Sequence, residues 1–487
     1  MIEKRRTVIT TDGEVDDMNS FLRYLLYSNE IDTAGIVLTS SVYHYAGNDK
    51  GVSPYRWTGT KWINEFIDYY EQVYPNLIKH ADGYPTAEYL RSIYHIGNIT
   101  APGEMEEETD GSRFLEKLIM DNDPRTLYIQ TWGGTNTTAR ALKSIQERYQ
   151  GTSEWQKVKD KIEEKLVIYI ILDQDVTYRE YIAKEWDITV INDKFNFWYF
   201  AYMWKQVHPE LTSRLKATWN LEKIRDNHGP LLEKYALIGD GNEIEGELYD
   251  ELRGTDLYLD THPEYERFEF ISEGDSPSYF YLFENGLRNA ENPQYGGWGG
   301  RFTQIRNNLY WNEAVDYNPY TKRFESEYTL TRWFDDIQDD FAARANWCVV
   351  EHYEDAVHYP RVALEELDKN VQPGQIVSLK VNASDPNNLD LSYYSWCYAE
   401  ASSYWDLSKI DLFSEHLLGV AGLQVSIHSN LMENPFEIDI EFSNSNNAKF
   451  VVPKDAKTGD TFHIITEISN VAKPPLKTYV RRILTVV

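Results

Sequence analysis

Cysteine is scarce in this chain of 487 residues, which contains only Cys348 and Cys397. Two cysteines are too few for a disulfide framework or for a zinc site built from thiolates. Because free cysteines are among the residues most often buried, we expect two buried thiols, with a bridge between them as the alternative.

Long hydrophobic runs are also missing. The sequence has no stretch of about 18 apolar residues and therefore predicts no transmembrane helix. The first ten residues, MIEKRRTVIT, are basic but lack the apolar segment of a signal peptide.

Positive charge is in short supply, with 48 lysines and arginines against 78 acidic residues and a formal net charge of −30. So acidic a chain repels phosphate backbones and anionic lipids, which argues against nucleic-acid and membrane partners. Aromatic residues are abundant, at 14% of the chain. Sugar-binding proteins often share this composition, although a large core also requires aromatic side chains.

Continuous apolar runs alternate with helical patterns over the first two thirds of the chain. Such an alternation predicts an α/β fold, in which a mostly parallel sheet is flanked by helices. Ligands of these sheets bind at the carboxyl ends of the strands. The expected strands span residues 6–10, 33–40, 126–132, 165–172 and 187–192.

The pattern changes toward the end of the chain. A helix is expected over 329–347, and short alternating strands after about residue 360 predict an immunoglobulin-like β-sandwich. We therefore expect a first domain over 1–345, a linker over 346–360 and an accessory β-domain without catalytic residues over 361–487.

Three aspartates, Asp12, Asp16 and Asp17, crowd one expected strand-to-helix turn in VITTDGEVDD. A divalent cation such as Ca²⁺ takes six to eight oxygen ligands and turns this repulsion into coordination. The alternative is helix capping by Asp16 or Asp17, for which one carboxylate would be enough. The residues alone leave both interpretations open.

TTDGEVDD resembles the D-x-D-x-G-x-D-D fingerprint of the nucleoside hydrolases, with Thr10 at its first aspartate and Glu14 at its glycine. The resemblance implies a nucleoside-hydrolase-like fold, in which Asp12 and Asp17 bind Ca²⁺ and Asp16 contacts the sugar. LYIQTWGGTNTTARAL is similar to a second family motif, which implies that the carbonyl of Thr135 also binds the ion.

EGDSPS resembles the family's late metal-binding segment and implies that Asp275 completes the coordination. Several motifs in order, WGGTN, DQD, NHGP, EGDSPS and GGWGGR, are similar to a bacterial nucleoside-hydrolase-like branch described as cellulose-binding. This resemblance covers nearly the whole chain. An Asx-type turn is the alternative explanation for Asp275.

Other polar and aromatic residues are weaker site candidates. His228 is a candidate proton donor or a packed turn histidine, and residues after the expected strands and in the GGWGGR loop are candidate substrate ligands. These ligand candidates are Asp173, Gln174, Asp175, Asn136, His44, Trp298 and Arg301.

We therefore expect a Ca²⁺-dependent glycosidic hydrolase acting on a ribofuranosyl-like substrate, in which Asp12 or Asp16 is the base that deprotonates the attacking water. The family's asparagine after the second strand is replaced here by a segment containing Ser40, Ser41 and His44. This departure favours an O-furanosidase over a nucleosidase. A carbohydrate-binding protein with a vestigial active site is the alternative from a different class. The resemblance implies a periplasmic or extracellular location if a leader precedes this sequence, and a cytoplasmic one otherwise.

Overall fold

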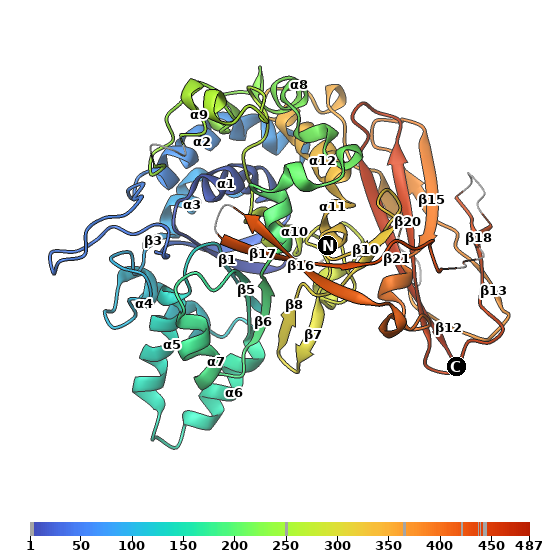
Figure 1. The fold of residues 1–487 in the computed structure, drawn as a ribbon, viewed down its shortest axis with the longest axis horizontal. Helices are drawn as coiled ribbons and strands as arrows, with labels where there is room; N and C mark the ends of the chain where they lie inside the picture. Colours follow the sequence, from blue (N-terminus) through green and yellow to red (C-terminus); the bar gives the residue numbers. More distant parts are fainter. Residues whose placement is uncertain are drawn as a thin grey trace.

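A computed structural model describes residues 4–248, 252–363, 367–419, 422–436, 438, 440–441 and 446–487. Its centre is an eight-stranded sheet with the order β3-β2-β1-β4-β5-β6-β8-β7 (Figure 1). Neighbouring strands run parallel, except for the β7–β8 edge pair. The strands are β1 (Arg6–Thr11), β2 (Asp32–Leu38), β3 (Tyr94–Ile96), β4 (Leu127–Thr131), β5 (Leu166–Ile171), β6 (Thr189–Asp193), β7 (Thr303–Arg306) and β8 (Leu309–Trp311).

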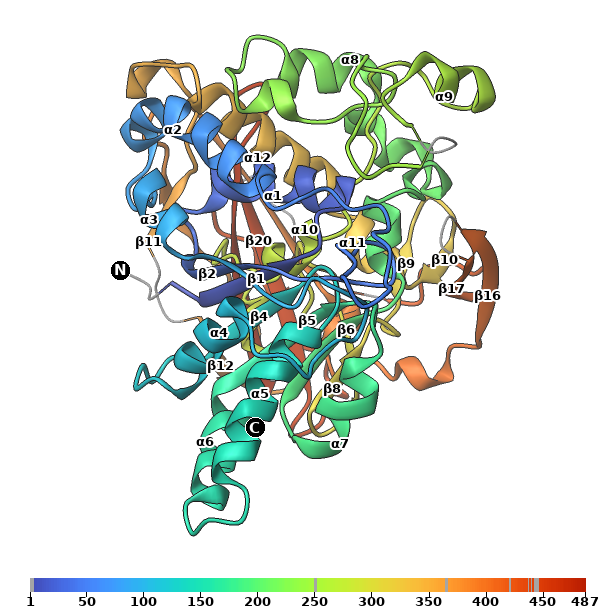
Figure 2. The same cartoon turned by 90° about the vertical axis from the view of Figure 1, so that its left-hand side faces the viewer.

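Helices cover both faces of this sheet. Figure 2 shows α1, α2 and α12 on one side and α4, α5, α6 and α7 on the other. The expected α/β fold is confirmed, and β1, β4 and β5 are buried along nearly their whole length because helices cover both faces of the sheet. The helices are α1 (Val15–Tyr27), α2 (Trp62–His80), α3 (Ala87–Ser92), α4 (Asp110–Met120), α5 (Asn136–Tyr149), α6 (Trp155–Lys165), α7 (Ala183–Glu185), α8 (Ala217–Asn220), α9 (Asp256–Thr261), α10 (Ser276–Phe280), α11 (Tyr328–Thr331) and α12 (Phe334–Trp347).

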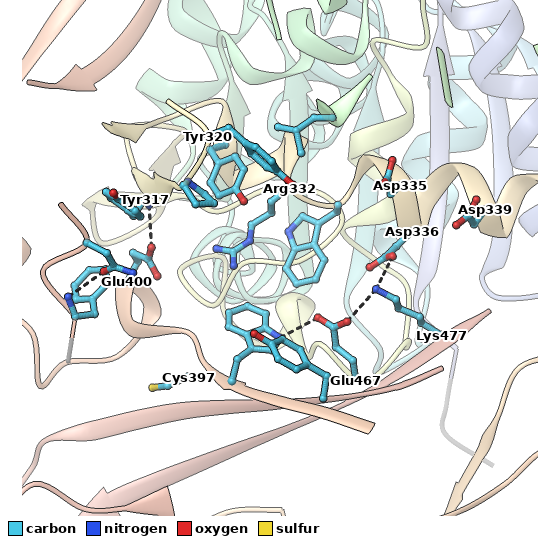
Figure 3. Close-up of a pocket in the computed structure, with 18 of the residues that line it drawn as sticks. Tyr317, Tyr320, Arg332, Asp335, Asp336, Asp339, Cys397, Glu400, Glu467 and Lys477 are labelled. Atoms are coloured by element: carbon cyan, nitrogen blue, oxygen red, sulfur yellow. Dashed lines mark hydrogen bonds and ion pairs between the residues drawn. The ribbon is translucent and has the colours of Figure 1, made fainter. Parts of the chain in front are cut away.

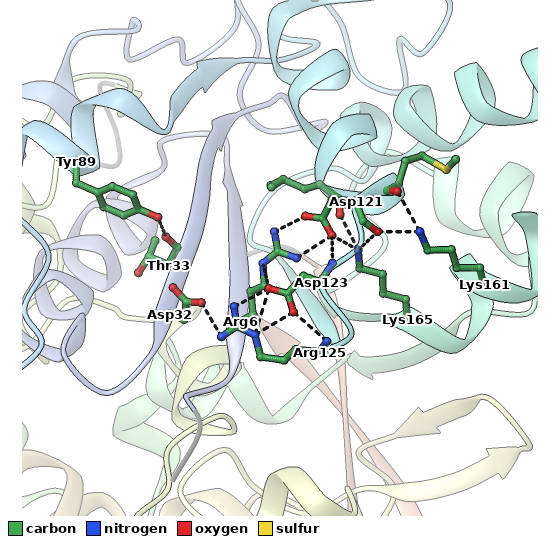
Figure 4. Close-up of polar contacts among 11 residues, drawn as sticks. Arg6, Asp32, Thr33, Tyr89, Asp121, Asp123, Arg125, Lys161 and Lys165 are labelled. Atoms are coloured by element: carbon green, nitrogen blue, oxygen red, sulfur yellow. Dashed lines mark hydrogen bonds and ion pairs between the residues drawn. The ribbon is translucent and has the colours of Figure 1, made fainter. Parts of the chain in front are cut away.

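Ion pairs gather at the amino ends of the strands, away from the acidic turn (Figure 4). Arg6 at the start of β1 lies 2.6 Å from Asp121, and Lys165 just before β5 pairs with the same carboxylate. Arg125 before β4 lies 2.7 Å from Asp123. This edge of the sheet is therefore tied together by opposite charges, whereas like charges meet at the carboxyl edge.

The C-terminal part is rich in strands, most of them antiparallel. One sheet has the order β12-β21-β20-β15 and another the order β13-β19-β18. Their strands are β12 (Lys369–Val371), β13 (Ile376–Ser378), β15 (Leu391–Cys397), β18 (Ile440–Glu441), β19 (Lys449–Val451), β20 (Thr461–Asn470) and β21 (Lys477–Val486). Two strand-rich layers agree with the expected all-β region, while its immunoglobulin-like type stays a prediction.

Strand pairing and side-chain packing cross the expected 346–360 boundary. Hairpin β16 (Leu412–Gly419) and β17 (Gly422–Ser429) joins β9 (Asp316–Asn318) and β10 (Arg323–Glu325) in one sheet. Tyr479 of β21 is buried in the same core cluster as α1 and α12. The two regions therefore fold against a shared core. Among the helices of the described ranges, none has the length and apolarity needed to cross a bilayer.

Candidate functional site

The acidic turn lies where β1 ends and α1 begins, at the carboxyl edge of the sheet. Gly13 has a φ of +84°, a conformation that a side chain would strain. This turn directs Asp12, Asp16 and Asp17 to one place, and all three are at least nine-tenths buried. The Asp12 amide donates to Oδ1 of Asp17 over 3.2 Å, and the Thr11 hydroxyl donates to the same oxygen.

Asp275 reaches the same place from a distant part of the sequence. Carboxylate oxygens of Asp16, Asp17 and Asp275 lie within 4.8 Å of one another and form a potential metal-ligand group. In the described part of the chain, Oδ2 of Asp12 and Oδ2 of Asp275 are buried and have no hydrogen-bond partner. Because an unpaired buried carboxylate is costly, these oxygens fit the donor set of a hard cation.

Electrostatics at this group disfavour four negative charges in the metal-free protein. Burial, followed by repulsion from Glu14, raises the pKa of Asp12 to about 7. Burial and neighbouring carboxylates also raise the pKa values of Asp16, Asp17 and Asp275 well above the ordinary value. The four carboxylates are therefore stabilised either by taking up protons or by binding a cation.

Glu273 anchors the segment that presents Asp275. Its carboxylate lies 2.6 Å from Nε of Arg23 on α1, and both side chains are fully buried. The Arg23 guanidinium also lies 3.8 Å from the ring centroid of Phe341 on α12. This ion pair holds the EGDSPS segment against α1.

The other residues of EGDSPS determine how closely this segment approaches the acidic group. A Cβ added to Gly274 would lie 2.8 Å from Oδ2 of Asp16, so glycine permits the close approach. The Ser276 hydroxyl donates to Glu273 over 2.7 Å, and the Ser278 hydroxyl donates to Oε1 of Gln130 on β4 over 2.8 Å. The motif thus connects α1, the sheet and the acidic group.

The WGGTN segment packs behind the acidic turn. A Cβ on Gly133 would lie 2.8 Å from Cβ of Asp12. The carbonyl of Thr135, expected to bind the ion, accepts the Ala139 amide over 2.8 Å within α5. Asn136 donates over 3.0 Å to the Ser40 hydroxyl, so this side chain joins the loop after β2 to α5.

Gln174 and Asp175 both lie beside the WGGTN segment, but they contact different groups. Oδ2 of Asp175 accepts the Asn136 amide over 2.8 Å, which places this carboxylate at the start of α5. Gln174 lines the cavity next to the aspartates and donates to the Trp132 carbonyl over 2.6 Å. Burial raises the pKa of Asp173 to about 6, and its carboxylate lies 3.5 Å from Arg179.

A narrow cavity of about 70 Å³ opens onto the acidic group. Aromatic side chains form much of its wall, and the charged side chains around it belong to several loops. Its lining includes Glu14, Asp16, Asp17, Tyr43, Arg56, Trp132, Gln174, Phe197, Trp198, Tyr202, Arg253 and Asp275. The combination of carboxylates, cations and aromatic rings suits a small polar ligand with an apolar face.

Several lining residues were not among the candidates from the sequence, Arg56, Tyr202 and Arg253 among them. The Tyr202 hydroxyl donates to Glu14 over 3.0 Å, and Arg56 lies 3.8 Å from Glu14. The Arg253 guanidinium lies 4.5 Å from the centroid of the Tyr202 ring. Glu14, read from the sequence only as a departure from the motif, therefore organises one wall. His44, a predicted substrate ligand, is not among the lining residues, but its Nε2 lies 3.7 Å from Glu14.

The structure separates three other candidates from this cavity. His228 is half-buried beside Gly229, which faces Val73 and Val349. Trp298 is buried and donates from Nε1 to the Tyr479 hydroxyl over 3.2 Å. Arg301 is buried, and its Nε donates to Asp316 over 2.9 Å. Trp298 and Arg301 therefore take part in packing between the two regions instead of lining the cavity, contrary to the position expected for them.

A solved structure with a TM-score of 0.72 supports the fold. A nucleoside hydrolase-related hypothetical protein from Saccharophagus degradans, described as associated with carbohydrate metabolism, is 23% identical over 100% of both chains, with a TM-score of 0.72. A plant nucleoside hydrolase is 11% identical over 63% of this chain and 87% of its own, with a TM-score of 0.30. An inosine-guanosine nucleoside hydrolase is 12% identical over 45% of this chain and 70% of its own, with a TM-score of 0.23.

No curated protein matches the chain. Two families do match. Residues 376–486 match the family described as cellulose-binding protein Sde0182, C-terminal domain. Residues 6–302, which contain the sheet and all four clustered aspartates, match the nucleoside hydrolase-like domain of cellulose-binding Sde182. The chain therefore belongs to the family of cellulose-binding Sde182 proteins with a nucleoside hydrolase-like domain.

Proposed function

We propose that this protein is a calcium-dependent glycosidic hydrolase that acts on a ribofuranosyl-like substrate. The observation that carries the proposal is the convergence of Asp16, Asp17 and Asp275 within 4.8 Å at the end of a cavity. Three buried carboxylates are stable together when a cation neutralises them, and a capping role would not bring Asp275 to this place.

Asp12, Asp17 and Asp275 would hold the ion, in keeping with the unpartnered Oδ2 atoms of Asp12 and Asp275 among the described residues. The Thr135 carbonyl remains a proposed further ligand, although it already accepts the Ala139 amide. When bound, Ca²⁺ would supply positive charge that orients a water molecule and two vicinal sugar hydroxyls.

Asp12 is proposed as the proton acceptor. Its carboxylate lies at the end of β1 beside Asp17, where it can both hold the ion and accept a proton from a water that the ion orients. Its carboxylate would take the proton of the water whose oxygen bonds to the anomeric carbon, while the bond to the leaving group breaks and the leaving atom takes a proton from solvent. Asp16, which accepts from the Tyr202 hydroxyl over 3.3 Å, is positioned to accept a hydrogen bond from a sugar hydroxyl.

Aromatic walls would hold the leaving group. Trp132, Phe197 and Trp198 line the same cavity as the carboxylates. Flat apolar faces accept either a nucleobase or the C–H face of a second sugar. The absent asparagine after β2 favours the second, so an O-furanosidase is the preferred form of the proposal.

Sugar release from inosine, uridine and furanosyl aryl glycosides tests the reaction, with calcium present or removed by a chelator. We expect calcium-dependent turnover of a furanosyl aryl glycoside and at least a hundredfold loss in Asp16→Asn. Turnover of nucleosides alone would contradict the O-furanosidase form. Absence of calcium binding by wild type in calorimetry would contradict the metal site itself, with Asp17→Ala as the matched variant.

A non-catalytic carbohydrate-binding protein is the second candidate. The family description, cellulose-binding, favours it. Under this alternative no furanoside is hydrolysed, and Asp16→Ala leaves sugar affinity unchanged. Hydrolysis of one furanosyl substrate by the purified protein would exclude it.

A further inference from the structure

A second and larger cavity lies between the two regions of the chain. This cleft, of about 540 Å³, is bounded by α11 and α12 on one side and by β15, β20, Asn434, Phe436 and Ile438 on the other. Figure 3 shows its walls, with Asp336 and Glu467 on opposite sides of Lys477. None of the four clustered aspartates lines it.

Aromatic side chains are concentrated along this cleft. Tyr394 and Tyr320 are 54% and 49% exposed, which is unusual for rings of this size. Tyr394 and Trp396 project from the same face of β15, because side chains two positions apart lie on one side of a strand. Further aromatic lining comes from Tyr317, Tyr328, Trp333 and Phe436.

Charged groups in the cleft are largely paired with each other. Lys477 lies 2.8 Å from Asp336 and 2.9 Å from Glu467, and Nε of Arg214 lies 2.6 Å from Asp339. The lining contains five acidic residues against three basic ones. An anionic ligand would therefore meet a negative surface without an available cation, whereas a neutral ligand rich in hydroxyls would find many acceptors.

One buried polar atom of the lining lacks a partner. Trp333 is 2% exposed, and in the described ranges its Nε1 makes no hydrogen bond. Its ring lies 6.1 Å from that of Trp396, whose own Nε1 donates to Glu467 over 2.9 Å. A buried N–H without an acceptor is costly, so this wall of the cleft contains an unsatisfied polar group.

From these observations we propose that the cleft is a binding site for a neutral glycan chain of pyranose sugars. Exposed rings stack on the C–H faces of sugars, and paired carboxylates with their cations bind the hydroxyls. The site is separate from the aspartate cavity, so it holds whether or not the proposed hydrolysis occurs. In the full-length protein it would fix the chain on a polysaccharide while the other cavity remains accessible.

Calorimetry with β-1,4-linked hexasaccharides of glucose, mannose and xylose tests this site. We expect wild type to bind at least one of them, and Tyr394→Ala and Trp396→Ala to weaken that binding at least about fivefold. Tyr89→Ala is the matched control, since Tyr89 is 41% exposed on α3, outside the cleft. Melting curves for each variant identify any loss of folding.

Asp17→Ala and calcium removal separate this site from the proposed active site. Both should abolish calcium-dependent turnover and leave hexasaccharide affinity unchanged. The proposal is overturned if wild type binds none of the three glycans. It is equally overturned if Tyr394→Ala and Trp396→Ala bind as tightly as wild type, or if Asp17→Ala loses the binding.

Discussion

Asp275→Asn should have opposite effects on the metal-free and the calcium-bound protein. Oδ2 of Asp275 is buried and makes no hydrogen bond within the described ranges, so the amide loses no partner there. The substitution keeps the size of the side chain and removes one negative charge from a group whose pKa values are all raised. Without calcium, this removal relieves repulsion.

The size of the relief follows from the geometry. Two unit charges 4.8 Å apart repel by about 3.5 kcal/mol at an effective dielectric constant of about 20. Partial protonation already reduces this repulsion in wild type, so we expect Asp275→Asn to raise the free energy of unfolding by about 1–3 kcal/mol near pH 8. In wild type, calcium at about 100 times its Kd should add about 2.7 kcal/mol. The variant should lose most of that gain.

Denaturant unfolding with calcium or with a chelator measures both quantities, and calorimetry measures the affinity directly. Asp193→Asn is a suitable control, because Asp193 is a buried carboxylate whose pKa is raised to about 6 by burial and which accepts the Phe197 amide. This control should retain the calcium increment. The reasoning is refuted if Asp275→Asn destabilises the metal-free protein and keeps the full calcium increment.

Three further predictions concern the residues that hold the acidic group in place and the pH dependence of stability. Arg23→Met leaves Glu273 as an unpaired buried charge and should lower the free energy of unfolding by about 3–5 kcal/mol, measured in urea, while Arg23→Met/Glu273→Met should recover part of it. Gly133→Ala places a Cβ 2.8 Å from Cβ of Asp12 and should weaken calcium binding about tenfold in calorimetry, whereas unchanged affinity would contradict this contact. Burial lowers the pKa of His463 from 6.5 to about 3. The neutral imidazole therefore makes its full contribution to the free energy of unfolding above pH 6.5, and this contribution is lost as pH falls toward 3. His463→Gln should therefore flatten the decline in stability between about pH 6 and 4 by about 2 kcal/mol, and an unchanged slope would contradict the assignment.

Local patterns in the sequence were sufficient for the α/β fold. Strand β5 is apolar along its whole length and β1 has an apolar centre, because both faces of these strands are covered. A run of apolar residues about six positions long can therefore be recognised as a buried strand without knowledge of the tertiary structure. Helix α6 and the β7–β8 pair were missed, since α6 is strongly charged and β7 and β8 are short and mostly not buried.

The acidic turn could also be read from the sequence, because three of its carboxylates lie within six residues of one another. The position of Asp275 was expected only from a family resemblance. Its approach depends on the buried ion pair between Arg23 and Glu273, and partners of opposite charge that lie 250 residues apart leave no periodic signal.

The sequence by itself thus determined the sheet, the acidic turn and the strand-rich C-terminal region, since these depend on neighbours along the chain. Only the tertiary structure decided which side chains share a cavity. It brought Tyr202 to Glu14 and Arg253 to the Tyr202 ring, and it placed Trp298 and Arg301 in packing between the two regions. Loop side chains acquire their neighbours through long-range packing, and the local pattern of a loop contains no information about which distant charge or ring it will meet.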